Sequence, residues 1–427
     1  MRHIFDQYNQ PENRLTHALI SCLAQDEKLL RRFIKLVTGQ TTPFREKIYL
    51  EEQCIPGQEE SDEDEAERKG MPDAWIYMES GRALLIESKV SQKLTIGQLK
   101  GHMATAKRQG FTYPQLLIIH TDPKKVRFRL QNNMSIISWS ELYEWTTKQS
   151  QISEWAGQFK SYLEIAEAKM VQNEYLKEGK LTRFSGIPFS SANPYNYIEA
   201  KRILRLLIDA LKSNKAFVKK MGASPFLPGR GAITGRTSSA VWDLIRLKGS
   251  KKDKTFTGYP HLTFAIASES ANFSVTIPNG VRPKIRKRFL GGTYEEFEKL
   301  ILSLLTSLRA VLELDKTAKP LIKVHQRHFP SQRSDGIHDA VLFCDLRTAK
   351  KNEKKTPEKY QPEWLKVIYE VMMNRKSNLQ LMIGVDISYK CSKVIQTPKA
   401  LRLIENIFIG LLPILNQYRK AQSKVYL

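Results

Sequence analysis

The run MPDAWIYMESGRALLIESK, from Met71 to Lys89, predicts a β-hairpin. Two apolar segments flank a three-residue loop that ends in Gly81, and loops of this kind favour glycine at their left-handed position. With this loop, Met78 pairs with Arg82, which fixes the register of the two strands. The same register places Asp73 opposite Glu87.

Side chains along a strand alternate between the two faces of a sheet. Alternate residues of the hairpin, among them Ala74 and Ile86, therefore form one apolar face, while Asp73, Glu87 and Lys89 share the other face. Two adjacent carboxylates repel each other unless a cation lies between them. Hard oxygen ligands at this spacing are the ligands that Mg²⁺ prefers. The hairpin thus predicts a magnesium site.

Helical and strand patterns alternate on both sides of the hairpin. An apolar stripe with helical spacing begins at Pro11 and runs through PENRLTHALISCLAQDEKLLRRFIKLV, which predicts a helix. The further predicted elements are a strand at 47–55, strands at 74–78 and 83–90, a helix at 92–109, strands at 115–120 and 134–139, and a helical stretch from 141 to about 178. This order of elements predicts an α/β sandwich.

The hairpin residues resemble the signature of the PD-(D/E)xK nuclease superfamily. Pro72-Asp73 is followed, after a gap of 13 residues, by Glu87-Ser88-Lys89 on an apolar strand. The resemblance covers roughly residues 1–145 and implies an α/β restriction-endonuclease-like domain with a central mixed sheet flanked by helices. Glu12 lies in the apolar stripe of the first helix, where many members carry an acidic residue, and Gln98 follows Lys89 on a helix, where members often carry a glutamine.

The resemblance implies a metal-dependent endonuclease, a hydrolase that cuts the phosphodiester bonds of DNA. Asp73, Glu87, Glu12 and the backbone carbonyl of Ser88 would hold one or two Mg²⁺ ions, for which Mn²⁺ is a substitute. Lys89 would orient or deprotonate the attacking water, and Gln98 would be a further catalytic residue, with His102 one helical turn from it. Nucleases of this kind often serve in bacterial antiviral defence, restriction or mobile-element systems. The resemblance is also compatible with a homodimer or a defence-system partner protein.

The charge of the chain is divided unevenly between its two parts. Residues 1–180 carry 25 basic and 25 acidic side chains, whereas residues 181–427 carry 43 and 19 and thus the whole net charge of +24. A Gly/Ser/Pro-rich segment at 181–194 marks the change and predicts a linker. We therefore expect a nuclease domain at 1–180 and a basic α+β domain at 195–427, in which helices are expected at 195–211, 294–314, 362–373 and 398–418.

Such an excess of positive charge favours a nucleic-acid partner, and the resemblance favours DNA over RNA. A glycine-rich loop and three basic clusters supply the predicted phosphate contacts: Arg230, Arg236, Lys251, Lys252, Lys254, Arg282, Lys284, Arg286, Lys287, Arg288, Lys350, Lys351, Lys354 and Lys355. Two alternatives stay open. The chain could be a non-catalytic nucleic-acid-binding subunit, or the second domain could sense a partner or ligand that gates the nuclease.

Composition excludes several other classes of protein. Hydrophobic residues make up 41% of the 427 residues, which excludes a disordered chain. The longest apolar stretch near the C-terminus, at 406–415, is about half of a membrane span, and the sequence begins without a signal-peptide pattern. Four widely spaced cysteines are typical of reduced thiols. We therefore expect a cytoplasmic protein without membrane contact.

Overall fold

The structure is a computed structural model of the chain. It describes residues 5, 8, 10–54, 56, 71–177, 179–229, 239–248, 256–281, 283–328, 330, 337–347, 362–373 and 379–426. The acidic run at 57–69 lies outside the described residues. Two compact units, Met1–Arg183 and Phe184–Leu427, divide the chain inside the segment expected to be a linker.

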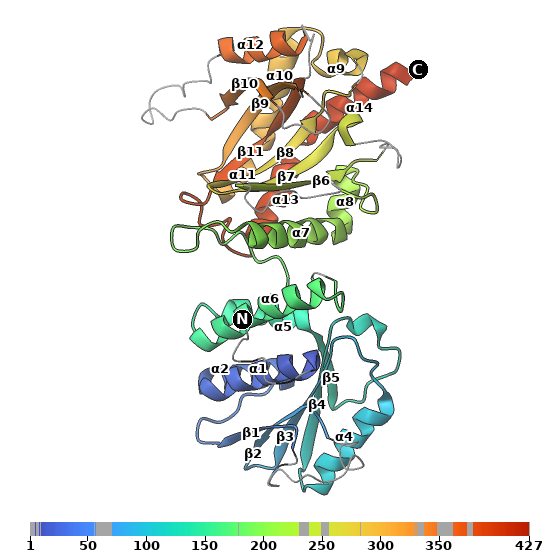
Figure 1. The fold of residues 1–427 in the computed structure, drawn as a ribbon, viewed down its shortest axis with the longest axis vertical. Coiled ribbons are helices and arrows are strands. Elements are labelled where there is room, and N and C mark those ends of the chain that lie inside the picture. The colour runs from blue at the N-terminus through green and yellow to red at the C-terminus, as the bar shows by residue number, and fades with distance from the viewer. Residues whose placement is uncertain are drawn as a thin grey trace. The chain divides into compact units, whose positions relative to one another are not determined.

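Within its described residues, the first unit contains one five-stranded sheet in the order β1-β2-β3-β4-β5 (Figure 1). β2 runs antiparallel to both of its neighbours, β1 and β3, whereas β3, β4 and β5 are parallel, so the sheet is mixed. The elements follow the chain as α1 (Pro11–Gln25), α2 (Glu27–Thr38), β1 (Ile48–Glu52), β2 (Ala74–Met78), β3 (Arg82–Lys89), α4 (Ile96–Arg108), β4 (Tyr113–His120), the short helix η1 (Pro123–Lys125), β5 (Met134–Ser138), α5 (Trp139–Gln149) and α6 (Glu154–Gln172).

Helices cover both faces of this sheet, and each face therefore has its own apolar core. Ala74, Ile86 and Leu117 on one face pack with residues of α1, α2, α5 and α6. Leu85 and Ile118 on the other face pack with α4 in a smaller core. Figure 1 shows α1 and α2 on one side of the sheet and α4 on the other. The predicted α/β architecture with a mixed sheet between helices is confirmed.

Two of the helical stretches expected in the first unit are divided by capping side chains. Asp26 leaves the helical conformation and its carboxylate accepts a hydrogen bond from Leu29 N at 2.9 Å, which ends α1 and begins α2. Ser153 caps α6 in the same way by accepting from Ala156 N at 3.2 Å, so the stretch predicted from 141 to 178 forms α5 and α6. Each cap satisfies backbone donors at a helix start that would otherwise be buried unpaired.

The second unit contains, in the described part of the chain, a six-stranded antiparallel sheet in the order β10-β9-β11-β8-β7-β6. Its elements are α7 (Tyr197–Ser213), α8 (Lys215–Met221), β6 (Ala240–Arg246), η2 (Phe256–Gly258), β7 (His261–Ala267), β8 (Ser270–Ile277), α9 (Pro283–Phe289), α10 (Tyr294–Ser307), α11 (Arg309–Leu314), β9 (Lys319–His328), β10 (Ile337–Asp345), α12 (Pro362–Met373), β11 (Leu379–Ser388), α13 (Ala400–Gly410) and α14 (Leu412–Tyr426).

One face of this sheet packs against helices in a single apolar core. Phe264, Phe273 and Ile383 extend from that face, and Ile187 and Phe189 of the expected linker are buried in the same core. The opposite face carries mostly polar and small side chains, among them a row of serine, asparagine and threonine along β8. An antiparallel sheet with helices on one face is an α+β arrangement, as expected for this part of the chain.

One basic cluster of the second unit forms a helix that was not among the predicted elements. The basic run around residue 284 forms the short helix α9. Ile285 and Phe289, one turn apart, are buried in the core and hold this helix against the sheet. None of the helices in the described residues combines the length and the apolarity that a membrane crossing needs.

Candidate functional site

The β2–β3 hairpin has the register that the sequence predicts. Ala74 pairs with Ile86 and Tyr77 with Ala83, and Gly81 in the connecting turn has a φ of +79°. The residue pairs of the hairpin all have the predicted register. Asp73 directly precedes Ala74, which pairs with Ile86, so Asp73 lies opposite Glu87. Glu87 and Lys89 lie on the face that α4 covers, because they alternate with residues of the opposite core.

Glu87 is the centre of a buried polar cluster at the end of β3. The residue is 1% exposed, and its Oε1 lies 2.6 Å from Lys89 Nζ and accepts a hydrogen bond from Gln98 Nε2 at 2.7 Å. His102 Nε2 lies 3.1 Å from Oε2. Burial acts to raise the pKa of Glu87, but the contacts with His102 and Lys89 outweigh it and lower that pKa. Glu87 is therefore a carboxylate held ionised inside the protein.

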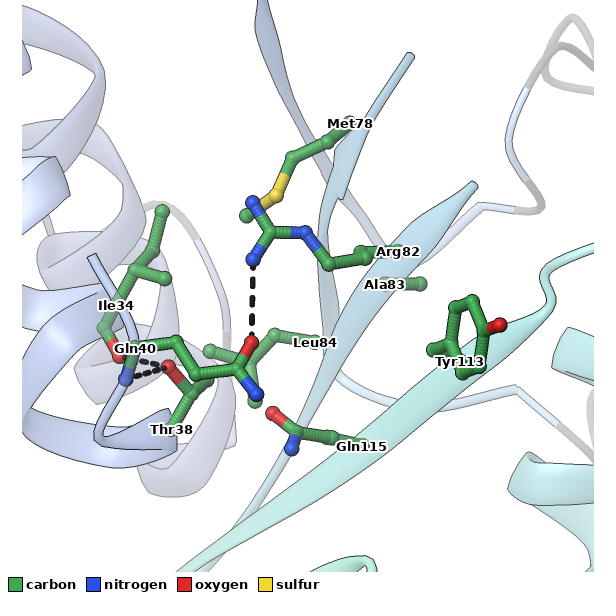
Figure 2. Close-up of a pocket in the computed structure, with 9 residues that line it drawn as sticks. All are labelled: Ile34, Thr38, Gln40, Met78, Arg82, Ala83, Leu84, Tyr113 and Gln115. Carbon is green, nitrogen blue, oxygen red and sulfur yellow. Dashed lines mark hydrogen bonds between the residues drawn. The ribbon is translucent and has the colours of Figure 1, made fainter. Parts of the chain in front are cut away.

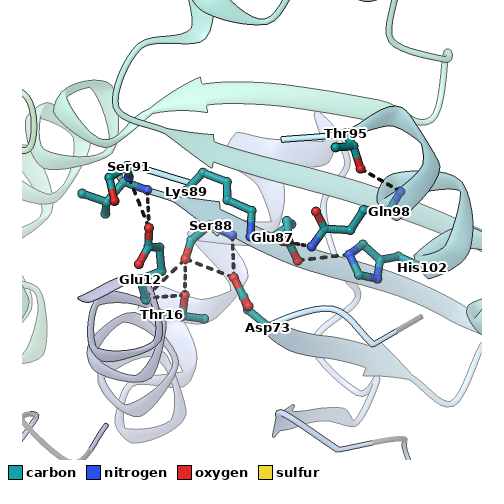
Figure 3. A network of polar contacts seen from close by, with 11 residues as sticks. Glu12, Thr16, Asp73, Glu87, Ser88, Lys89, Ser91, Thr95, Gln98 and His102 are labelled. Atoms are coloured by element: carbon teal, nitrogen blue, oxygen red, sulfur yellow. Dashed lines mark hydrogen bonds and ion pairs between the residues drawn. The ribbon is translucent and has the colours of Figure 1, made fainter. Parts of the chain in front are cut away.

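Helix α4 supplies two of the contacts to Glu87. Gln98 and His102 lie four residues apart and so project from the same face of α4 toward the sheet (Figure 3). Thr95 caps the start of this helix by accepting a hydrogen bond from Gln98 N at 3.3 Å. The sequence predicted Gln98 as a site residue and His102 as its neighbour, and the structure brings both to the same carboxylate.

Lys89 reaches Glu87 from two residues along the same strand. Its side chain is 9% exposed. Burial acts to lower the pKa of Lys89, but the negative charge of Glu87, supported by Asp73 and Glu12, outweighs burial and raises that pKa. Lys89 is therefore a protonated ammonium at neutral pH.

Asp73 is half-buried at the start of β2 and contacts the neighbouring strand through its carboxylate. Its Oδ2 accepts hydrogen bonds from Ser88 N at 2.7 Å and from Ser88 Oγ at 3.1 Å. Burial and, after it, the charge of Glu87 raise the pKa of Asp73 from 3.8 to about 6. A cation bound between the two carboxylates would offset the repulsion that destabilises ionised Asp73.

The backbone of Ser88 also takes part in the site. In a strand, the N–H and C=O of one residue leave the same edge, and those of the next residue leave the opposite edge. Lys89 O accepts a hydrogen bond from Thr121 N on the β4 side, whereas Ser88 N donates to Asp73. The carbonyl oxygen of Ser88 therefore lies on the edge of β3 that faces Asp73.

Glu12 joins α1 to the end of β3. It is 4% exposed, and its Oε1 accepts hydrogen bonds from Val90 N at 3.3 Å and Ser91 N at 3.2 Å (Figure 3). The backbone carbonyl of Glu12 accepts from Ser88 Oγ at 3.3 Å, and Thr16 Oγ1 lies 2.7 Å from the same hydroxyl. These contacts fix the strand end, and the negative charge of Glu12 contributes to the raised pKa of Lys89.

The oxygen atoms of this cluster are of the types that a hard divalent cation binds. Glu87 Oε2 is buried, and apart from its ion-pair contact with His102 it accepts no hydrogen bond of good geometry from the described residues. With the Asp73 carboxylate and the carbonyl of Ser88, it gives the mixed carboxylate and carbonyl set that Mg²⁺ takes. No group of three or more His, Cys, Asp or Glu side chains in the described part of the chain forms an all-side-chain metal site. A metal would therefore need the backbone carbonyl or water as a further ligand.

Sequence reasoning missed two residues beside this cluster. Thr16 lies one turn after Glu12 on α1, and helical spacing alone could have placed it there. His120 ends β4 directly beside Lys89 in the parallel pair, and its Nδ1 accepts a hydrogen bond from Asp122 N at 2.8 Å. Burial lowers the pKa of His120. The position of a histidine at the carboxyl end of a strand could have indicated a site residue, but only the register of the parallel pair shows that His120 lies beside Lys89.

Most of the predicted phosphate contacts lie outside the described residues: Arg230, Arg236, Lys251, Lys252, Lys254, Arg282, Lys350, Lys351, Lys354 and Lys355. Lys284, Lys287 and Arg288 are exposed on α9. Arg286 corrects the prediction, because it is 2% exposed and donates to Leu379 O at 3.3 Å and Pro278 O at 2.8 Å. Its guanidinium satisfies buried carbonyls and does not face solvent.

A separate hollow lies at the other end of the same sheet (Figure 2). It has a volume of about 370 Å³ and is lined by residues of α2, β2, β3 and β4. Arg82 at its edge donates to Gln40 Oε1 at 3.2 Å and to Glu46 Oε2 at 2.7 Å. Arg82 precedes Glu87 by five strand residues, about 17 Å, so this hollow is not part of the carboxylate cluster.

Comparison with known proteins adds no family to this geometry. The chain matches no protein-family model, and no curated protein is similar to it in sequence.

Proposed function

We propose that the chain is a Mg²⁺-dependent nuclease of the PD-(D/E)xK type that hydrolyses phosphodiester bonds of DNA. The observation that carries this proposal is the proximity of Asp73, Glu87 and Lys89 at one end of the β2–β3 hairpin: Lys89 Nζ lies 2.6 Å from Glu87 Oε1, and the charges of both residues act on the pKa of Asp73. The mixed sheet, with an antiparallel hairpin continued by parallel strands and covered by helices on both faces, supports a restriction-endonuclease-like fold.

Asp73, Glu87 and the carbonyl of Ser88 are the proposed ligands of the metal, for which Mn²⁺ is a substitute. A bound Mg²⁺ polarises a phosphate oxygen and makes bound water more acidic. Gln98 and His102 hold the Glu87 side chain in place through contacts of 2.7 and 3.1 Å, so the carboxylate needs little rearrangement to act as a ligand.

Lys89 acts in this proposal as a hydrogen-bond donor and a positive charge. Its raised pKa keeps the ammonium protonated at neutral pH, which favours orientation of water or phosphate over removal of a proton. Glu12 acts as a positioning residue, because its Oε1 already accepts from the amides of Val90 and Ser91. It holds the end of β3 against α1 and so fixes the backbone position of Lys89, whose side chain lies on the α4 side of the sheet.

The second unit supplies nucleic-acid binding in this account. Residues 181–427 carry the whole net charge of +24, and Lys284, Lys287 and Arg288 of α9 are exposed. We further propose a bacterial defence, restriction or mobile-element system as the setting, on the resemblance of the hairpin motif alone. A chain that binds DNA but lacks turnover is the alternative that the experiment below separates.

The test is an incubation of the purified chain with supercoiled plasmid, linear duplex, single-stranded DNA and RNA, each with Mg²⁺, with Mn²⁺ and with EDTA. Lys89→Ala removes the ammonium of the site, and Lys93→Ala is the matched control because Lys93 is exposed. We expect metal-dependent cutting of DNA by the wild type and by the control, and none by Lys89→Ala. Cutting by Lys89→Ala at the wild-type rate contradicts the proposal.

A further inference from the structure

The open face of the second sheet contains a pocket that the proposed nuclease site does not use. It has a volume of about 310 Å³ and is lined by strands β7, β8, β9, β10 and β11. Pockets that bind small molecules begin at roughly this size. The side chains that give it chemical character are Ser270, Asn272, Lys323, Phe343, Met382 and Asp386.

The strand register explains why the sheet is hollow at this point. Gly384 of β11 lies between Ser274 of β8 and Leu321 of β9. A Cβ at Gly384 would lie 2.3 Å from Phe273 O, so the position excludes any side chain. Ala265 of β7 is the neighbour of Asn272 on the same face and is also small. Small residues therefore leave space in the middle of this sheet face, whereas the longer side chains of the lining surround that space.

One polar atom of the pocket lining is buried without a hydrogen-bond partner among the described residues. This atom is Asn272 Oδ1. Most buried polar groups in folded proteins are hydrogen-bonded. An unpaired acceptor in the lining of a hollow indicates a ligand that carries a hydrogen-bond donor of its own.

Opposite charges lie at the two sides of the pocket. Asp386 pairs directly with Asn272 and accepts a hydrogen bond from Ser270 Oγ at 2.9 Å. Burial raises the pKa of Asp386, which Ser270, Lys319 and Lys323 oppose. Lys323 lies between Met382 and Phe343 in the adjacent row. The pocket thus offers an acceptor at one side and a cation at the other.

Phe343 gives the pocket an exposed aromatic wall. Its ring is on β10 at the edge of the sheet, and the residue is 57% exposed. An exposed aromatic ring beside a cation is the combination on which unpaired bases stack while the cation meets the phosphate. The amide of Asn272 and the carboxylate of Asp386 match the donors and acceptors on the edge of a base.

We infer that this pocket binds unpaired nucleotides, with one base against Phe343 and its phosphate near Lys323, and the polar edge of another base toward Asn272 and Asp386, because the register separates these two pairs of residues by four residues, about 13 Å, along the strands. The choice of nucleotides over another small polar molecule rests on the proposed nucleic-acid function. The nucleotides belong either to a single strand or to free mononucleotides, which share this chemistry. The net charge of +24 in this half of the chain favours the strand.

The test measures binding of the full chain in EDTA, where a metal-dependent nuclease does not cut. The probes are a fluorescein-labelled 12-nucleotide DNA single strand and an abasic strand of the same length, which keeps the phosphates but lacks the bases. Phe343→Ala should weaken binding of the base-bearing strand about 5- to 150-fold and leave the abasic strand unchanged. Val341→Ala, at an exposed position two residues away on the same face, should change neither.

Further variants separate the parts of the site. Lys323→Ala should weaken both strands alike, because it removes a phosphate contact. Asn272→Leu should weaken only the base-bearing strand and raise the melting temperature, because an unpaired polar atom is removed. AMP, GMP, CMP or TMP can be added as competitors of the labelled strand. Competition that occurs with the wild type and is lost in Phe343→Ala supports a pocket that also binds free nucleotides. Failure to compete supports a pocket specific to strands.

Equal binding of the base-bearing strand by the wild type and Phe343→Ala would overturn the inference. Equal loss of both strands in that variant would also overturn it, provided that circular dichroism shows an unchanged fold. A chain that never cuts DNA but shows the base-dependent pattern retains this inference and loses only the nuclease proposal, so the two failures are distinguishable.

Discussion

Replacing Asp73 by asparagine should stabilise the metal-free protein while it abolishes cleavage. The pKa of Asp73 rises from 3.8 to about 6 in the folded chain, because burial and Glu87 oppose its ionisation. Ionised Asp73 therefore costs folding free energy. A difference of about two pKa units corresponds to about 3 kcal/mol. The neutral amide of Asp73→Asn avoids this cost and keeps an oxygen that accepts from Ser88 N.

The pH dependence of this gain has a definite sign. A folded pKa above the unfolded value means that the wild type has no penalty below about pH 3.8, a growing penalty between pH 3.8 and 6, and the full penalty above about pH 6. In EDTA at pH 8, Asp73→Asn should raise the melting temperature of the first unit by about 6–12 °C. At pH 5 the gain should shrink to about half.

The assay is thermal unfolding by circular dichroism at pH 8 and pH 5, with and without Mg²⁺. Glu79→Gln is the control, because Glu79 is an exposed carboxylate in the turn of the same hairpin. Mg²⁺ should stabilise the wild type, by about 2.7 kcal/mol at a concentration 100 times its Kd, and leave Asp73→Asn unchanged. A variant less stable than the wild type in EDTA at pH 8, or a gain independent of pH, refutes the reasoning.

Three further predictions concern separate contacts. Glu12→Ala should lower the unfolding free energy by about 1–3 kcal/mol, because two strand-end amides lose their acceptor, whereas Glu12→Gln should retain most of it in urea titrations. Arg286→Ala should lower stability in the same titration, because Leu379 O and Pro278 O lose their donor, and leave the salt dependence of DNA binding unchanged. DNA affinity of the full chain in EDTA should fall about 10³-fold or more between 50 and 200 mM salt, and binding insensitive to salt in fluorescence anisotropy would contradict a phosphate-tracking surface.

The part of the site that depends on local rules could be predicted from the sequence. A turn with Gly81 and the alternation of strand side chains determine the hairpin register, so they place Asp73 opposite Glu87, with Lys89 two residues further along the same strand. Helical spacing does the same for Gln98 on α4. These relations involve residues close in sequence, and their geometry follows from strand and helix periods.

The parts that depend on tertiary contacts could not be predicted in the same way. Glu12 bonds to amides 78 and 79 residues further along the chain, and no local pattern specifies that partner. Arg286 was predicted as a phosphate contact from its place in a basic cluster, but the packing of α9 turns it toward buried carbonyls. The break between α1 and α2 at Asp26 is different: it was not predicted, although aspartate is a favoured helix cap and the sequence alone could have indicated it.

The most direct test of the proposed metal-dependent chemistry compares two isosteric substitutions in the same hairpin. Glu87→Gln keeps the size of the side chain but removes the buried charge, whereas Glu79→Gln changes an exposed turn residue. Relaxation of supercoiled plasmid in Mg²⁺ should proceed with the wild type and with Glu79→Gln and fail with Glu87→Gln. Plasmid cutting by Glu87→Gln at the wild-type rate would contradict the account.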